Sequence, residues 1–196
     1  MVNISPSIAS SNLLDIKNEI KKVEDANSYT LHLDIEDGNF VPNITFGMKL
    51  INMIRKQTKI NISYHLMVTN PLFWIYELPL RDNDIVFAHV ESYRYPKYII
   101  NSIKKRGANA GIVFNPATSI EQYEYLVSVC DNIMIMTSEP DKDGEYFIEE
   151  MIDKILMAKK FNFKNIWVDG GINKEKIETL SKIGVSNFIV GRYFFK

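Results

Sequence analysis

The sequence predicts an α/β fold in which a single domain, residues 1–196, forms an eight-stranded parallel barrel. Eight short apolar segments alternate with longer amphipathic ones, which is typical of consecutive strand–helix units around a parallel sheet. The length of 196 residues is that of one domain. No Gly-x-Gly-x-x-Gly follows the first apolar segment, which disfavours the competing arrangement, an open doubly wound sheet. The eight units are therefore expected to close into a (β/α)8 barrel.

The predicted strands are short apolar runs, and the predicted helices are segments whose apolar residues recur at helical spacing. Ile177, Leu180 and Ile183, for example, share one side of a helix with lysines and glutamates between them. Only residues 191–196 follow the eighth strand, so the last helix is expected to be truncated or missing, and aromatic residues 193–195 or a partner subunit would cover the groove there. The strands are expected at residues 4–8, 30–35, 60–67, 84–89, 108–114, 132–136, 165–168 and 187–190, and helices at 13–25, 96–105, 119–127, 146–160 and 174–183, among others.

The composition excludes several classes of protein. A hydrophobic fraction of 46% is enough for a buried core, and a net charge of −1 indicates no polyanion-binding surface, so neither nucleic acid nor a membrane is an expected partner. No apolar run approaches the roughly 20 residues of a membrane span. No signal peptide is visible, which predicts a cytoplasmic protein. Cys130 is the only cysteine, which excludes an internal disulfide and favours a small buried hydrophobe.

Histidines and aspartates gather at the ends of predicted strands. In such a barrel the catalytic groups lie at the C-terminal ends of the strands. His32 and Asp34 are two residues apart, so both side chains project to the same face. His65 ends the neighbouring strand, and Asp169 follows strand seven. Two imidazoles and two carboxylates at one mouth indicate a site for one divalent metal ion, Zn²⁺, Fe²⁺, Mn²⁺ or Co²⁺. The alternative is a set of ordinary strand-end polar groups, solvated or capping a helix.

Two carboxylates beside a metal ion suit proton transfer at carbon. A carbon next to a ketone is a weak acid, and a metal on the carbonyl and adjacent hydroxyl oxygens would stabilise the enediolate that deprotonation produces. If the carboxylates stand on opposite faces of that carbon, one removes the proton and the other returns a proton from the far side. The carbon centre is then inverted.

Seven motifs, taken in order, resemble those of the ribulose-phosphate 3-epimerase family over essentially the whole chain. The long segment 32–47 carries most of the resemblance. The motifs are ISPSI at 4–8, HLDIEDGNFVPNITFG at 32–47, HLMV at 65–68, HVE at 89–91, NPAT at 115–118, MT at 136–137 and VDGG at 168–171. The resemblance implies a TIM barrel of the ribulose-phosphate-binding type that acts on a small ketose phosphate and forms a homo-oligomer.

The resemblance also implies roles for individual residues. Asp34 and Asp169 would be the catalytic acid and base, and His89 and Glu91 would support the site without binding the metal. The metal ligands would be His32, Asp34, His65 and Asp169, and the residues near the substrate would be Ser7, Met67, Met136, Gly170, Gly171 and Gly191.

Four positions depart from the family's pattern. Glu36 stands where the family usually has methionine, and it would either accept hydrogen bonds from sugar hydroxyls or be solvated. At 140–145 the family has a glycine-rich loop that binds the phosphate. Here Gly144 is the one glycine of this segment, and two of its other residues are aspartates. Arg192 replaces a small serine and would either bind the phosphate with a bidentate fork or lie along the surface. Tyr64 replaces an acidic residue before the second metal histidine, a change expected to loosen the site.

The predicted function is metal-dependent epimerisation at C3 of a ketose phosphate of the D-ribulose 5-phosphate/D-xylulose 5-phosphate type. The changes at Glu36, 140–145 and Arg192 favour, as an alternative, a longer hexulose or heptulose phosphate that supplies sugar for a surface polysaccharide. A lyase or decarboxylase on the same barrel is disfavoured because strand three offers His65 where those relatives use a lysine. A non-catalytic metal-binding barrel is the remaining alternative. The altered loop and missing helix favour it, whereas the four intact ligand positions argue against it.

Overall fold

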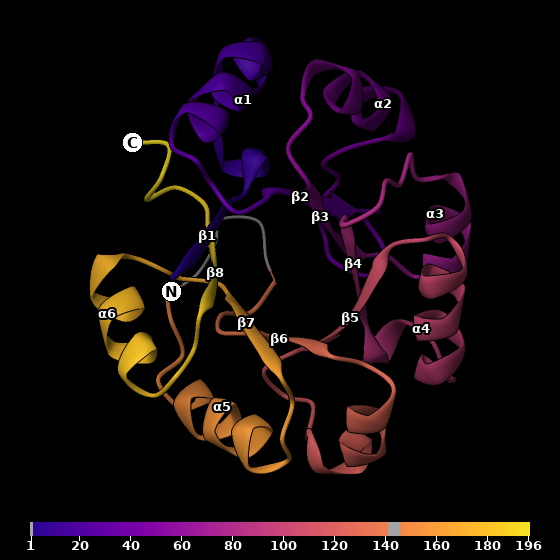
Figure 1. Cartoon of the computed structure of the whole chain (residues 1–196), viewed down its shortest axis with the longest axis vertical. Helices are drawn as coiled ribbons and strands as arrows, with labels where there is room; N and C mark the ends of the chain where they lie inside the picture. Colours follow the sequence, from indigo (N-terminus) through magenta and orange to yellow (C-terminus); the bar gives the residue numbers. More distant parts are fainter. Residues whose placement is uncertain (1, 141–145) are drawn as a thin grey trace.

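Eight parallel strands form a barrel with helices on its outside (Figure 1). The computed structural model describes residues 2–140 and 146–196. Neighbouring strands follow the order β1-β8-β7-β6-β5-β4-β3-β2, which confirms the predicted (β/α)8 fold. The strands are β1 (Asn3–Pro6), β2 (Leu31–Glu36), β3 (Ile62–Met67), β4 (Ile85–His89), β5 (Asn109–Phe114), β6 (Asn132–Met136), β7 (Asn165–Asp169) and β8 (Asn187–Val190).

The seam between β1 and β2 completes the barrel through few backbone contacts. Ser7, just after β1, forms a parallel bridge with His32. Near the start of β2, the Tyr29 amide donates to the Ile4 carbonyl at 2.8 Å. Because this seam joins the first two strands, it brings Ser7 next to a predicted metal ligand.

A helical segment lies in each connection from β1 to β8, on the outside of the barrel (Figure 1). Two of these helices begin with asparagine N-caps: the Asn70 side chain accepts from the Phe73 amide, and the Asn173 side chain accepts from the Lys176 amide. Pro71 then starts its helix with a backbone angle already suited to it. The helices are α1 (Ile16–Asp25), α2 (Met48–Gln57), α3 (Pro71–Glu77), α4 (Pro96–Lys105), the 3-10 helix η4 (Glu121–Ser128), α5 (Met151–Lys160) and α6 (Lys174–Lys182), with shorter 3-10 turns η1 (Ile8–Ser10), η2 (Leu13–Asp15) and η3 (Val90–Ser92).

The segment predicted as a helix at 119–127 is the 3-10 helix η4. A 3-10 helix has about three residues per turn, and Ile120, Tyr123 and Leu126 recur at that spacing. Ile120 and Leu126 are buried, and Tyr123 packs partly buried against the core. A spacing of three fits both helix types, so periodicity alone could not distinguish them.

Residues 191–196, after β8, contain no helix. In Figure 1 this segment runs outward between α1 and α6. Phe194 and Phe195 pack against the core with their ring centroids 4.9 Å apart, whereas Tyr193 is 43% exposed. Two of the three aromatic residues therefore pack onto the core after β8. Within 2–140 and 146–196, no helix is long and apolar enough to cross a membrane.

Alternate side chains of the strands fill two different spaces. Those facing outward pack with the helices in the main core, and those facing inward form a smaller cluster that includes Phe87 and Trp167. Gly111 leaves room for Phe87, because a Cβ at this position would lie 2.2 Å from its ring. Side chains on a strand alternate with a period of two. The next inward positions after Phe87 and Trp167 therefore belong to His89 and Asp169, at the C-terminal mouth of the barrel.

Candidate metal centre

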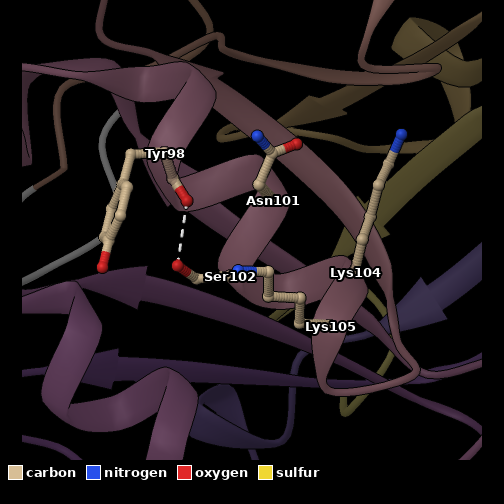
Figure 2. Close-up of a pocket in the computed structure, with 5 residues that line it drawn as sticks. All are labelled: Tyr98, Asn101, Ser102, Lys104 and Lys105. Atoms are coloured by element: carbon tan, nitrogen blue, oxygen red, sulfur yellow. Dashed lines mark hydrogen bonds between the residues drawn. The ribbon is translucent and has the colours of Figure 1, made fainter.

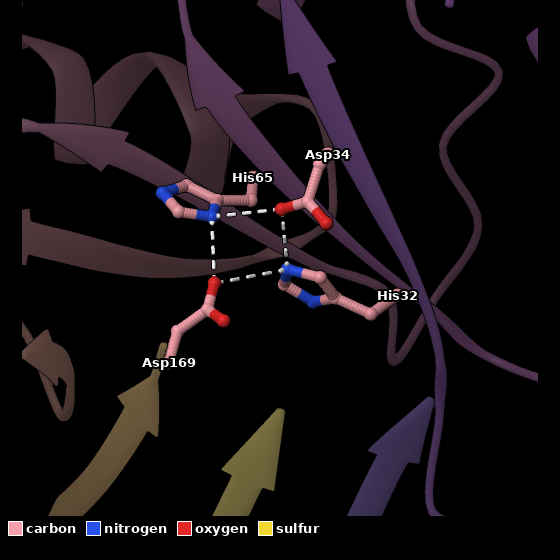
Figure 3. A group of neighbouring side chains, drawn as sticks. All are labelled: His32, Asp34, His65 and Asp169. Atoms are coloured by element: carbon pink, nitrogen blue, oxygen red, sulfur yellow. Dashed lines mark hydrogen bonds and ion pairs between the residues drawn. The ribbon is translucent and has the colours of Figure 1, made fainter. Parts of the chain in front are cut away.

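The four side chains predicted as metal ligands converge at the C-terminal mouth of the barrel (Figure 3). One ligand atom from each of His32, Asp34, His65 and Asp169 lies within 4.8 Å of the other three. His65 Nδ1 is 3.1 Å from Asp34 Oδ1 and 3.2 Å from Asp169 Oδ2. His32 Nε2 is 3.1 Å from Asp34 Oδ1 and 3.7 Å from Asp169 Oδ2. The carboxylates occupy opposite corners of this four-ligand group, with a histidine nitrogen at each remaining corner.

Strand register explains why these side chains meet. Asp34 on β2 lies beside His65 on β3, and His32 shares the inward face of β2 with Asp34. Asp169 ends β7. Both imidazoles are completely buried, whereas 13% of the Asp34 side chain and 16% of the Asp169 side chain are exposed. The carboxylates therefore face the open side of the site, where a small molecule can reach them.

The imidazoles and carboxylates shift each other's protonation. Burial raises the pKa of Asp34. The charges and hydrogen bonds of His32 and His65 lower this pKa by a larger amount, so the net shift is downward. Burial lowers the pKa of His65, but its hydrogen bonds to Asp169 and Asp34 raise it to about 9. A metal ion bound at these atoms would therefore displace a proton from His65.

A chain of buried, hydrogen-bonded hydroxyl groups begins at Nδ1 of His32, the ring nitrogen that faces away from the four-ligand group. His32 Nδ1 lies 2.8 Å from Ser63 Oγ, and Ser63 Oγ lies 2.9 Å from Thr30 Oγ1. Thr30 in turn donates to Ser5 Oγ at 2.7 Å. Such a partner fixes the orientation of a metal-ligating imidazole. Ser63 is not among the predicted site residues, although its position two residues before His65 places it on the same inward face.

Tyr64 does not line the site, and its expected effect on the site stays a prediction. Its side chain is completely buried in the outer core, on the opposite face of β3 from His65. Burial raises the pKa of the Tyr64 phenol to about 12. Because neighbouring residues of a strand point to opposite faces, the inward place beside His32 belongs to Ser63.

His89 and Glu91 lie behind His65 and contribute no atom to the four-ligand group. His65 Nε2 is 2.9 Å from His89 Nε2, and His89 Nδ1 is 3.2 Å from Glu91 Oε2. Burial lowers the pKa of His89 to about 4, against the opposing effect of its hydrogen bond to Glu91. Burial therefore favours the uncharged form of the His89 imidazole.

Three of the predicted substrate residues lie beside the carboxylates at the mouth. The Ser7 hydroxyl donates to Asp34 Oδ2. The register of the sheet places Met136 beside Asp169, and Met67 beside Glu36. Both methionines are 4% exposed, so they form part of the wall of the mouth.

At three of the predicted glycines, another part of the chain comes too close to the backbone to leave room for a side chain. The φ angles of +114° at Gly170 and +67° at Gly171 fall in the left-handed region that favours glycine. A Cβ at Gly170 would lie 2.2 Å from Ser138 Oγ, and a Cβ at Gly191 would lie 2.5 Å from Ser10 Oγ. These close approaches bring the loops after β6, β7 and β8 together with the turn after β1.

The remaining predicted phosphate residues are Arg192 and Gly144. Arg192 follows Gly191 directly in the turn after β8 and is an exposed residue. Gly144 and the rest of 141–145 lie outside the described residues.

Glu36 has a buried oxygen at the mouth of the barrel. Its Oε2 has no hydrogen-bond partner among the described residues. Burial, followed by the charge of Asp34, raises the pKa of Glu36 to about 7, although His65 lowers it. Buried polar atoms normally have a partner. Glu36 Oε2 can therefore accept a hydrogen bond that the described residues do not supply.

Two features outside the mouth give less indication of a functional site. A hollow along α4 is lined by polar side chains, and the Ser102 hydroxyl there already donates to the Tyr98 carbonyl at 2.9 Å (Figure 2). Cys130 is buried, and burial raises the pKa of its thiol to about 11, which supports its interpretation as a small hydrophobe. The residues lining the hollow are Tyr98, Asn101, Ser102, Lys104 and Lys105.

Fold and site together define a class of protein. The molecule is a TIM barrel that carries a two-histidine, two-carboxylate group able to hold a divalent metal ion. That group lies at the end of the barrel where enzymes of this fold carry out their chemistry.

Comparison with known proteins narrows this class to one family. The model of the ribulose-phosphate 3 epimerase family matches residues 3–195. The ribulose-phosphate 3-epimerase of Methanocaldococcus jannaschii is 34% identical over 100% of this chain and 85% of its own length. That of Bacillus subtilis is 32% identical over 97% of this chain and 91% of its own length. The chain belongs to the ribulose-phosphate 3-epimerase family.

A solved structure of another protein shows how widely the fold is shared. The tryptophan synthase A-subunit of Pyrococcus furiosus superposes with a TM-score of 0.69 at 14% identity, covering 98% of this chain and 87% of that one. At this identity the likeness concerns the barrel fold alone.

Proposed function

We propose that the protein is a metal-dependent ketose-phosphate 3-epimerase that interconverts a pair of the ribulose 5-phosphate/xylulose 5-phosphate type. The observation that supports this most directly is the placement of Asp34 and Asp169 at opposite corners of the four-ligand group. Membership of the family and the printed activity of its relatives supply the substrate class.

Asp34 and Asp169 would be the paired acid and base at C3 of the sugar. One carboxylate removes the C3 proton from one face, and the other delivers a proton to the opposite face, so that the configuration inverts. The Ser7 hydroxyl, which donates to Asp34 Oδ2, would orient that carboxylate. A divalent ion (Zn²⁺, Fe²⁺, Mn²⁺ or Co²⁺) held by these two aspartates with His32 and His65 would stabilise the negative charge that builds up on the substrate oxygens.

The phosphate group would lie against the loops after β7 and β8. Gly170, Gly171 and Gly191 let these loops pack closely against their neighbours. The backbone amides of the loops would then bind the phosphate. Arg192 would add a guanidinium, a group that matches phosphate geometry. Met67 and Met136 would line the sugar on its apolar side. A homo-oligomeric state stays a prediction.

Proton NMR in D2O tests the reaction. Metal-loaded protein mixed with a panel of five- to seven-carbon ketose phosphates is expected to place deuterium at C3 and to produce the C3 diastereomer of at least one sugar. A chelator should abolish both signals, and added metal should restore them. Absence of exchange with every sugar, despite bound metal, would instead support a non-catalytic metal-binding barrel. Release of formaldehyde or CO2 would support a lyase or decarboxylase.

A longer ketose phosphate is the second candidate substrate, and Glu36 favours it. Its buried Oε2, which has no hydrogen-bond partner within 2–140 and 146–196, would accept a hydrogen bond from a hydroxyl that a five-carbon sugar does not place there. Because the pKa of Glu36 is about 7, the comparison is made above pH 8, where the carboxylate is ionised. A hydrogen bond to a charged group is worth about 1.5–3 kcal/mol, so Glu36→Met is expected to lower kcat/KM for the longer sugar there by roughly 10- to 100-fold. The value for ribulose 5-phosphate should change by no more than a few-fold.

The control for Glu36 is Glu121→Met, which removes an exposed carboxylate on η4 and should leave kcat/KM for every sugar unchanged. Steady-state rates on the same sugar panel provide the comparison. If ribulose 5-phosphate is the best substrate of the panel, the longer sugar is dropped as a candidate.

A further inference from the structure

Both ring nitrogens of His65 have partners, and the two sets of partners differ. Its Nδ1 faces the four-ligand group, 3.1 Å from Asp34 Oδ1 and 3.2 Å from Asp169 Oδ2. Its Nε2 faces away, 2.9 Å from His89 Nε2. His65 is completely buried, His89 is 2% exposed, and the Phe40 ring covers His89 with centroids 4.7 Å apart. Solvent therefore does not compete for the contact between the two imidazoles.

The two imidazoles meet edge to edge. Their planes differ by 14° and their centroids are 5.0 Å apart, whereas their Nε2 atoms are only 2.9 Å apart. Nearly parallel rings whose nitrogens are so much closer than their centres share one N–H···N hydrogen bond. One Nε2 must donate and the other must accept, so the bond has two alternative directions.

The Glu91 carboxylate decides between these directions. Its Oε2 is 3.2 Å from His89 Nδ1, and an ionised carboxylate can only accept. His89 Nδ1 must therefore carry a hydrogen. An imidazole with a single hydrogen has one donor and one acceptor nitrogen, so the hydrogen held at Nδ1 by Glu91 leaves His89 Nε2 to accept from the Nε2–H of His65. A neutral His65 protonated at Nε2 has its lone pair on Nδ1, which points into the four-ligand group.

The loop after β5 holds Glu91 in place. Glu91 Oε1 accepts from the Asn115 amide at 3.0 Å. The Lys154 ammonium, on α5, clamps the same loop by donating to the carbonyls of Asn115 at 2.9 Å, Pro116 at 2.6 Å and Thr118 at 2.8 Å. Because Glu91 Oε1 is anchored to this loop, Glu91 Oε2 stays directed at His89.

We propose that His89 and Glu91 are positioning residues that select the tautomer of His65 and so present its Nδ1 to a divalent cation. This inference rests on the proposed metal centre of the epimerase, but metal binding tests it without any catalytic assay. Loss of a hydrogen-bonding partner behind a metal-ligating histidine typically lowers metal affinity by about 10- to 100-fold.

Nitrogen NMR of the intact, histidine-labelled protein loaded with Zn²⁺ reads the tautomers directly. His65 is expected to be metal-bound at Nδ1 and protonated at Nε2, and His89 to be protonated at Nδ1. A proton on His89 Nε2 would overturn the proposal, because it reverses the hydrogen bond between the two rings.

Variants of the two positioning residues test the consequence for affinity. Glu91→Gln keeps the shape of the side chain, but its amide can also donate, so it no longer selects the tautomer of His89. His89→Phe removes the acceptor for His65 Nε2–H, and His89→Gln restores an acceptor oxygen. Chelator-competition titration of Zn²⁺ is expected to show a 10- to 100-fold loss for Glu91→Gln and His89→Phe and a smaller loss for His89→Gln.

The control is Glu124→Gln, which removes an exposed carboxylate on η4 and should leave Zn²⁺ affinity unchanged. Visible spectra of the Co²⁺-loaded forms should change only in variants at 89 and 91. Unchanged affinity in both Glu91→Gln and His89→Phe, or no Zn²⁺ binding by the unsubstituted protein, would overturn the proposal. Zn²⁺ binding with the expected tautomers but no epimerisation would remove the proposed function and leave this inference standing.

Discussion

Replacing Asp169 with asparagine is expected to lower kcat/KM for the ketose phosphate by about 10⁴-fold, the upper end of what one general acid or base contributes. Asparagine keeps the size of the side chain but cannot take up or deliver the C3 proton. The same substitution also removes a negative oxygen from a group in which Asp169 Oδ2 lies 3.2 Å from His65 Nδ1. Rates of C3 epimerisation by NMR, with metal content measured in the same samples, provide the test.

The isotope pattern should identify which carboxylate serves which face. With Asp169→Asn, Asp34 remains, so only the epimer whose C3 proton faces Asp34 should still exchange with D2O, without producing its diastereomer. Asp34→Asn should show the reverse preference. Asp131→Asn is the control, because the Asp131 side chain is 54% exposed and pairs with Lys164 at the surface. A loss smaller than tenfold in metal-loaded Asp169→Asn would refute the assignment.

Replacing Asp84 with alanine is expected to destabilise the fold by about 3–5 kcal/mol, as is usual when one partner of a buried ion pair is removed. Asp84 is completely buried just before β4. Its Oδ1 accepts from Arg55 Nη2 at 3.1 Å and from the Ile62 amide at 2.7 Å, and its Oδ2 accepts from the Arg81 amide at 2.8 Å. Alanine would leave the Arg55 guanidinium, which is only 5% exposed, without its counter-ion.

Urea unfolding measures this loss. Asp84→Asn, which keeps an acceptor oxygen, should lose less stability than Asp84→Ala. Asp82→Asn, at an exposed position two residues earlier, should change the free energy of unfolding by less than about 0.5 kcal/mol. Because Asp84 precedes a strand whose opposite end bears His89, kcat per folded molecule should be unaffected. A loss below about 1 kcal/mol in Asp84→Ala would contradict the role assigned to this pair.

Local patterns in the sequence were sufficient to predict the strands and the faces that their side chains occupy. The alternation of side chains is a property of each strand by itself, so His32 and Asp34 could be placed on one face before any partner strand was known. The same reasoning was insufficient for η4, because Ile120, Tyr123 and Leu126 suit a 3-10 helix as well as an α-helix. The side chain of Tyr64 belongs to the outer core, on the face opposite His65.

The sequence by itself determined the succession of strands and helices, the family, and the side chains that end the strands at the mouth of the barrel. Only the tertiary structure decided which of these groups touch. Ser7 reaches Asp34, Ser63 holds the far nitrogen of His32, and His89 meets His65. Each of these contacts joins two different strands, or a strand and the loop that follows another. Their distances depend on sheet register and on closure between β1 and β2, which no local periodicity encodes.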